Sequence, residues 1–124
     1  MIAEKIKTQL RTGVLEYCVM QILRRGEVYA SDIIDELLEV DLIKVEGIIY
    51  PLLMRLKQEN LVQYEWSEAQ SGLPKKQYQL TDSGQNTIKA LDETWIEINK
   101  SAKKIKKKTD EQLKVAKQES QEGN

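Results

Sequence analysis

The side chains that could do chemistry in this sequence are few, and most reactive pairs are excluded. The chain of 124 residues contains no histidine and one cysteine, Cys18. Without histidine, no serine–histidine or cysteine–histidine nucleophile and no histidine-based metal site can form. A single cysteine supplies neither an internal disulfide nor a zinc site of CxxC pairs, and its apolar helical surroundings favour a packing role. We therefore expect no enzyme activity, no metal and no cofactor.

What remains is a group of cations and aromatic rings in two short stretches. Residues 46–66 read EGIIYPLLMRLKQENLVQYEW, and a turn of 100° per residue collects an unusual set on one side of this helix. An ordinary solvated face would carry more Glu and Lys than this set: Gly47, Tyr50, Pro51, Met54 and Gln58. Five cations fall near this helix and the following turn: Lys44, Arg55, Lys57, Lys75 and Lys76. Cations beside an open helix face are typical of nucleic-acid binding.

The apolar spacing predicts the elements that must position these side chains. Residues 2–25 and 31–40 read as helices, and a third helix begins at Val45 and ends before Asn60, a C′ residue. Its buried side is expected to comprise Val45, Ile48, Ile49, Leu52, Leu53 and Leu56. Two alternating stretches, 61–66 and 76–80, predict a two-stranded hairpin with a long loop. The fold class is mainly α with a small β-hairpin, a winged helix-turn-helix whose third helix enters the DNA major groove.

A last helix follows Thr81, Asp82 and Ser83, which are good N-terminal residues. Its apolar residues recur at spacings of three and four, as in a coiled-coil seam, and comprise Ile88, Leu91, Trp95, Ile98, Ala102 and Ile105. One domain has little left to cover this seam, so a second copy of the chain is the natural partner. We expect a DNA-binding domain over residues 1–80, a dimerisation helix over 81–108 and a polar, flexible tail over 109–124.

Pro51 inside a short helix needs an explanation. A proline there removes one hydrogen bond and clashes with the carbonyl group four residues earlier, at Gly47, where the missing side chain eases the adjustment. Gly47 would also let the backbone approach a DNA strand. The alternative is a plain structural kink at the start of a helix.

As a set, these motifs resemble the PadR family of bacterial transcriptional regulators over about residues 10–96. The matching residues are Gly47, Tyr50, Pro51, Arg55, Leu56, Leu61, Trp66, Gly72, Lys75, Lys76, Tyr78, Leu80, Thr81, Gly84 and Trp95. The sequence departs from the family pattern at two places. Ala30 and Ser31 replace the family's Gly-Tyr, and Asn60 replaces its Gly. The short C-terminus is similar to that of compact members with one dimerising helix.

The resemblance implies a dimeric repressor that binds double-stranded operator DNA and is released by a small planar aromatic ligand at the dimer interface. The DNA-binding residues would be Ser31, Lys44, Gly47, Tyr50, Pro51, Met54, Arg55, Lys75 and Lys76. The ligand and dimer interface would comprise Leu10, Val14, Ile88, Leu91, Asp92, Trp95, Ile98 and Ile105.

Charge leaves a second function open. The net charge is −1, and acidic residues outnumber basic ones over residues 27–68, which counts against DNA binding. The alternative is a winged-helix adaptor that binds proteins and has no sequence-specific DNA binding. The basic run at residues 100–108, KSAKKIKKK, reads as a solvated helix face, with a DNA contact as the sharper alternative. One cysteine, no signal segment and no apolar run of membrane length favour the cytoplasm.

Overall fold

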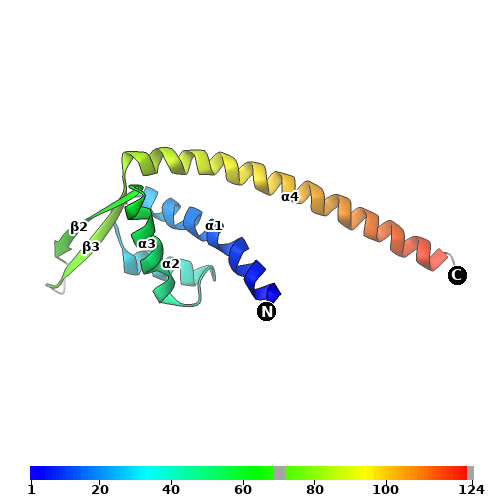
Figure 1. Cartoon of the computed structure of the whole chain (residues 1–124), viewed down its shortest axis with the longest axis horizontal. Helices are drawn as coiled ribbons and strands as arrows, with labels where there is room; N and C mark the ends of the chain where they lie inside the picture. Colours follow the sequence, from blue (N-terminus) through cyan, green and yellow to red (C-terminus); the bar gives the residue numbers. More distant parts are fainter. Residues whose placement is uncertain (69–71, 123–124) are drawn as a thin grey trace. The chain divides into compact units, whose positions relative to one another are not determined.

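The computed structural model describes residues 1–68 and 72–122 and confirms the predicted fold class. The elements in chain order are α1 (Ile2–Arg24), β1 (Val28–Tyr29), α2 (Ala30–Glu39), the 3₁₀ turn η1 (Glu46–Ile48), α3 (Ile49–Gln58), β2 (Val62–Glu68), β3 (Pro74–Leu80) and α4 (Asp82–Glu122) (Figure 1). The chain forms two compact units, Met1–Lys89 and Ala90–Asn124, and the first contains the winged helix.

The core of the first unit is built from one face of each of its helices. Val19 of α1, Ile33 of α2 and Ile49 of α3 are completely buried, and Ile88 of α4 is as well. The base of the hairpin closes this core with Val62, Tyr78 and Leu80. Cys18 is half-buried on α1, where burial raises the pKa of its thiol, in keeping with the expected packing role.

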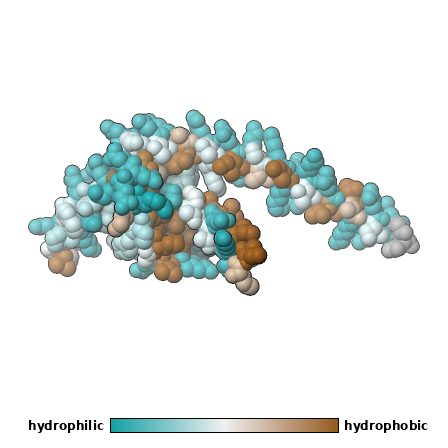
Figure 2. Space-filling view, viewed as in Figure 1, coloured by the Kyte–Doolittle hydropathy of each residue, from teal (hydrophilic) through white to brown (hydrophobic). Residues whose placement is uncertain are grey.

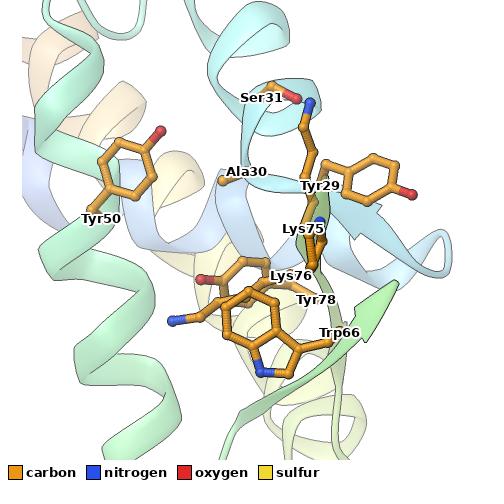
Figure 3. A pocket seen from close by; sticks show the side chains of 9 residues that line it. Tyr29, Ala30, Ser31, Tyr50, Trp66, Lys75, Lys76 and Tyr78 are labelled. Atoms are coloured by element: carbon orange, nitrogen blue, oxygen red, sulfur yellow. The ribbon is translucent and has the colours of Figure 1, made fainter. Parts of the chain in front are cut away.

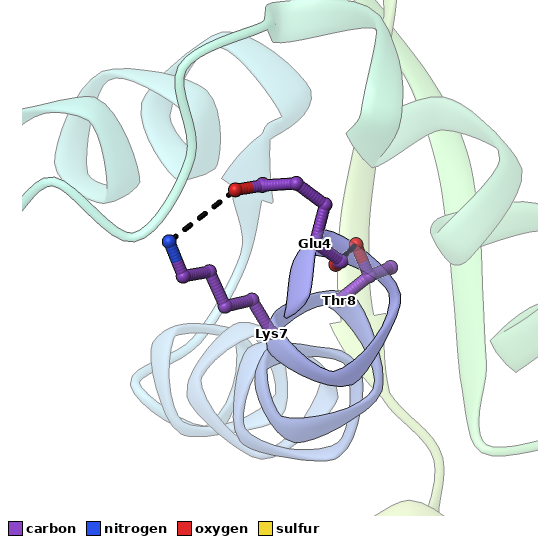
Figure 4. Close-up of polar contacts among 3 residues, drawn as sticks. All are labelled: Glu4, Lys7 and Thr8. Carbon is purple, nitrogen blue, oxygen red and sulfur yellow. Dashed lines mark hydrogen bonds and ion pairs between the residues drawn. The ribbon is translucent and has the colours of Figure 1, made fainter. Parts of the chain in front are cut away.

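The first half of α1 lies outside this core. Ile2, Ile6 and Leu10 are 79%, 57% and 74% exposed. Local contacts support the helix here: Lys7 Nζ lies 3.3 Å from Glu4 Oε1, and Thr8 Oγ1 donates to the Glu4 carbonyl oxygen at 3.0 Å (Figure 4). These exposed side chains leave an apolar stripe without cover in the single chain.

The hairpin belongs to a three-stranded antiparallel sheet of order β1-β3-β2. The prediction had only two strands, and it missed β1 because two residues are too few to show alternation. Across β2 and β3, Tyr64 pairs with Tyr78 and Trp66 with Lys76. This register places the rings of Tyr64 and Trp66 and the Lys76 ammonium group on one side of the hairpin.

The start of the third helix corrects two predictions. Val45 and Ile48, expected to be buried, are 68% and 52% exposed. The 3₁₀ turn advances by about 120° per residue, so residues before Ile49 fall out of phase with the buried face of α3. Pro51 is the third residue of α3, where a backbone N–H has no partner within the helix. It therefore removes no hydrogen bond of α3 itself, in agreement with the structural alternative of a helix start.

The end of α3 is as predicted. Asn60 has φ 62° and follows the C-cap Glu59. Its N–H donates to the Lys57 carbonyl at 3.0 Å, and the Leu61 N–H donates to the Leu56 carbonyl at 2.9 Å. These two bonds make a Schellman motif, which turns the chain into β2.

The last helix is longer than expected. α4 continues to Glu122 instead of ending near Lys108. Strong helix formers and local pairs support the extension: Lys106 Nζ lies 2.8 Å from Asp110 Oδ2. Apolar side chains recur along it (Figure 2), among them Ile98 and Ile105 at 58% and 70% exposure. In the part of the chain described, no helix is long and apolar enough to cross a membrane.

Candidate nucleic-acid interface

A groove of about 390 Å³ lies among the start of α2, α3 and the hairpin, and we call it the wing groove (Figure 3). It is lined by Tyr29, Ala30, Ser31, Tyr50, Trp66, Pro74, Lys75, Lys76 and Tyr78. All these residues belong to the first compact unit. The groove therefore combines aromatic walls with two ammonium groups, a chemistry suited to a polyanion that also presents apolar edges.

The two hairpin lysines lie close to aromatic rings. Lys76 Nζ is 4.5 Å from the centroid of the Tyr64 ring and 5.5 Å from that of Trp66. Lys75 Nζ is 5.9 Å from the Tyr29 ring. Consecutive residues of a strand point to opposite faces, so the two lysines use different rings. Cation–π attraction limits their freedom and keeps each ammonium group near the surface.

The start of α2 forms one side of the groove. The Tyr29 N–H donates to Asp32 Oδ2 at 3.0 Å, and the Tyr29 hydroxyl lies 2.9 Å from Ser67 Oγ. Figure 3 shows the Lys75 side chain extending toward Ser31, which is exposed at the first turn of the helix. Backbone N–H groups at a helix start favour anions, so Lys75 and this turn can act together on a phosphate.

Tyr78 lines the groove and packs against a second phenol, that of Tyr64. The Tyr78 ring is buried, and its centroid lies 5.6 Å from that of Tyr64. Burial raises the pKa of the Tyr78 phenol above its ordinary value, and repulsion from Tyr64 and Tyr50 when these are ionised adds to the rise. The phenol is therefore neutral at physiological pH and adds no negative charge to the groove.

The structure brings together four of the residues predicted to bind DNA, since Ser31, Tyr50, Lys75 and Lys76 all line the wing groove. The other predicted residues on η1 and α3 are exposed beside it. Met54 is 63% exposed, and a Cβ added at Gly47 would meet nothing within 4 Å. Pro51 is exposed in the first turn of α3, and Lys44 is exposed in the loop before η1.

Arg55 is placed differently from its predicted neighbours. Its guanidinium group forms an ion pair and hydrogen bond with Glu16 of α1. It faces α1 because it lies near the edge of the buried stripe of α3 and not at the centre of the exposed side. The pair engages the Nη2 group of Arg55.

Sequence reasoning missed five lining residues, namely Tyr29, Ala30, Trp66, Pro74 and Tyr78. Strand alternation could have grouped Trp66 with Tyr64. It could not have placed Lys76 opposite Trp66, because the register depends on the length and geometry of the long loop.

The residues predicted for the ligand and dimer interface differ in exposure. Leu10 is 74% exposed and Val14 half-buried, whereas Ile88 is fully buried inside its own chain. Leu91 and Asp92 are half-buried. Trp95 is 38% exposed, and Ile98 and Ile105 are more exposed still.

Comparison with known proteins agrees with this architecture. The family model described as the transcriptional regulator PadR-like family matches residues 19–90. No curated protein sequence matches the chain. A PadR-like transcription factor from Bacteroides fragilis is 46% identical with a TM-score of 0.69, over 82% of this chain and 98% of that one. A PadR-like transcriptional regulator from Bacillus cereus is 28% identical with a TM-score of 0.71, over 78% and 95%.

A third solved structure includes DNA. Bacillus subtilis PadR in complex with operator DNA is 31% identical with a TM-score of 0.57, over 63% of this chain and 46% of that one. The family model covers more than half of the sequence, and the Bacteroides fragilis protein is similar over most of it. The chain belongs to the PadR-like family of transcriptional regulators.

Proposed function

We propose that this protein is a dimeric repressor that binds operator DNA through α3 and the wing groove. The observation that carries the proposal is the placement of Lys75 and Lys76 on aromatic rings beside the exposed side of α3. α3 would enter the major groove, and the hairpin would contact the flanking backbone. The likeness to a PadR protein solved with operator DNA supports this arrangement.

Phosphate contacts would come from few groups. Lys75, Lys76 and Lys44 supply the cations, and Ser31 with the start of α2 supplies neutral donors. The net charge of −1 adds no long-range attraction to DNA. We therefore expect moderate affinity that falls steeply with salt, because each neutralised phosphate releases counterions.

The dimer would form through the exposed apolar side chains of α1 and α4. Leu10 on α1 and the seam residues Ile98 and Ile105 on α4 are exposed, and Trp95 of the same seam is 38% exposed. A planar aromatic ligand would bind between the subunits near Trp95, whose indole face stacks on aromatic rings, and would loosen DNA binding.

The adaptor function has one structural observation in its favour. Asp35 and Glu39 of α2 and Glu46 of η1 are exposed in the same unit as the wing groove and would repel phosphates. A winged helix that binds a basic protein segment would use these carboxylates instead. A measurement of sequence-specific DNA binding distinguishes the repressor from the adaptor.

The test measures fluorescence anisotropy of a labelled duplex taken from immediately upstream of this protein's own gene. A scrambled duplex is the control, and both are titrated at two salt concentrations. Replacing Lys75→Ala and Lys76→Ala together removes four lysines from the dimer and should lower the slope of log K against log salt by roughly 3.6, about 0.9 for each lost phosphate contact. The matched variant Lys114→Ala/Lys117→Ala removes the same charge from exposed positions on α4 outside the basic run and should bind like the wild type.

Two results would contradict the repressor. One is equal, weak binding of both duplexes at low salt, also with duplexes from other promoters. The other is equal weakening by the two double-lysine variants, which would show that net charge alone attracts DNA. Thermal unfolding followed by circular dichroism confirms that each variant is folded.

A further inference from the structure

The side of η1 and α3 that faces solvent is mostly apolar. Ile48, Tyr50 and Met54 are 52%, 54% and 63% exposed. Tyr50 and Met54 are four residues apart and so lie one turn apart on the same side of the helix. Leaving three large apolar side chains in water at the start of one short helix favours a partner that buries them.

The long cationic side chains of α3 are directed elsewhere. Arg55 is paired with Glu16 of α1, and Lys57 Nζ lies 5.1 Å from the centroid of the Tyr64 ring. A guanine edge is read best by Arg or Lys, and an adenine edge by Asn or Gln. Before Arg55, residues 49–54 of the helix include none of these side chains, so these bidentate contacts are not available there.

The major groove offers one base feature that suits apolar side chains, the C5-methyl group of thymine. Recognition helices of this architecture use their N-terminal residues on the base edges, which here are η1 and the first turns of α3. Gly47 adds no bulk to this end, since a Cβ there would meet only open space. The helix can therefore approach the floor of the groove closely, as a methyl contact requires.

We propose that Ile48, Tyr50 and Met54 read the C5-methyl groups of thymine in the operator and are the specificity-determining residues of α3. The inference rests on the proposed DNA-binding function. Glu46, exposed at the start of η1, can accept a hydrogen bond from a cytosine amino group and would disfavour the acceptor edge of guanine. The preferred half-site then contains thymine opposite α3.

The experiment uses the full chain and in vitro selection from a random duplex library at low salt. The selected duplex is resynthesised with deoxyuridine in place of each thymidine in turn, which removes one methyl group and keeps the base pair. At one or more positions the dissociation constant should rise about fourfold, the value of one buried methyl group. Positions outside the selected site serve as the control and should show no change.

Protein variants assign the effect to α3. Met54→Ala should weaken binding to the thymidine duplex and reduce the thymidine-to-deoxyuridine ratio toward one at its own position, because the two changes remove the same contact. Leu113→Ala is the matched control, since Leu113 of α4 is also 63% exposed. It should keep the full ratio.

The outcomes separate the two proposals. No enrichment of any sequence overturns sequence-specific DNA binding and the methyl contact with it. Enrichment of a duplex whose affinity is the same with deoxyuridine at every position overturns the methyl contact and leaves DNA binding intact. A deoxyuridine effect that persists unchanged in Ile48→Ala, Tyr50→Ala and Met54→Ala also overturns the assignment to α3.

Discussion

At the scale of single residues, the sharpest constraint is a glycine next to a backbone carbonyl. Gly84 is buried in the first turn of α4, and a Cβ added there would lie 2.1 Å from the Leu61 carbonyl oxygen. Thr81 fixes this contact: its hydroxyl donates to the Asn60 carbonyl at 2.7 Å and accepts the Gly84 N–H at 3.0 Å. The backbone of the loop after α3 therefore packs directly against the backbone at the start of α4.

Gly84→Ala should reduce the free energy of unfolding by about 1–3 kcal/mol, because backbone must move to admit the methyl group. Alanine otherwise favours a helix over glycine, so a loss of stability would point specifically to this contact. Urea unfolding followed by circular dichroism measures the change. The control is Gly47→Ala, where a Cβ meets open space. Equal stability of the Gly84 variant and the wild type would contradict this account.

At the scale of elements, the position of Pro51 at the start of α3 determines how much this proline changes the free energy of unfolding. Pro51 lies in the first turn, whereas Met54 lies one turn further and is also exposed. Pro51→Ala should change the free energy of unfolding by less than about 1 kcal/mol. Met54→Pro should cost about 3 kcal/mol, because the N–H at position 54 belongs to the helical hydrogen-bond ladder. Thermal and urea unfolding of the two variants test this, and a large gain of stability in Pro51→Ala would show that this proline lies in the helix interior and removes a hydrogen bond there.

The elements also show how far sequence reasoning reaches. The helices, the hairpin, the C′ role of Asn60 and four residues of the wing groove could be predicted, because each depends on local spacing or local chemistry. The two-residue β1, the exposure of Ile48 and the direction of Arg55 could not. They depend on strand pairing, on the 3₁₀ turn before α3 and on the position of Glu16 in another helix. The longer α4 was missed because a polar stretch of strong helix formers also matches a flexible tail.

At the scale of the whole molecule, the central question is what covers the apolar residues of α4. Ile96 and Ile98 are two residues apart and exposed to a similar extent, 65% and 58%. Ile98 continues the spacing of three and four that includes Trp95 and Ile105, whereas Ile96 falls outside it. If the seam binds a second α4, self-association should depend on Ile98 and not on Ile96.

The proposed dimer predicts that a lysine weakens self-association at position 98 and has little effect on it at position 96. Ile98→Lys places an ammonium group in the seam, and an unpaired charge in a buried interface costs about 3 kcal/mol or more, which corresponds to roughly a hundredfold weaker self-association. Ile96→Lys leaves the seam unchanged, and exposed charges there have little effect. Analytical ultracentrifugation over a range of concentrations measures the dimer fraction of each variant.

DNA affinity should fall together with the dimer fraction in Ile98→Lys and stay unchanged in Ile96→Lys, because a palindromic operator is bound by two copies of α3 at a fixed spacing. Equal dimer fractions in the two variants would mean that α4 does not pair through this seam, and the exposed stripe on α1 would then be the remaining surface for self-association.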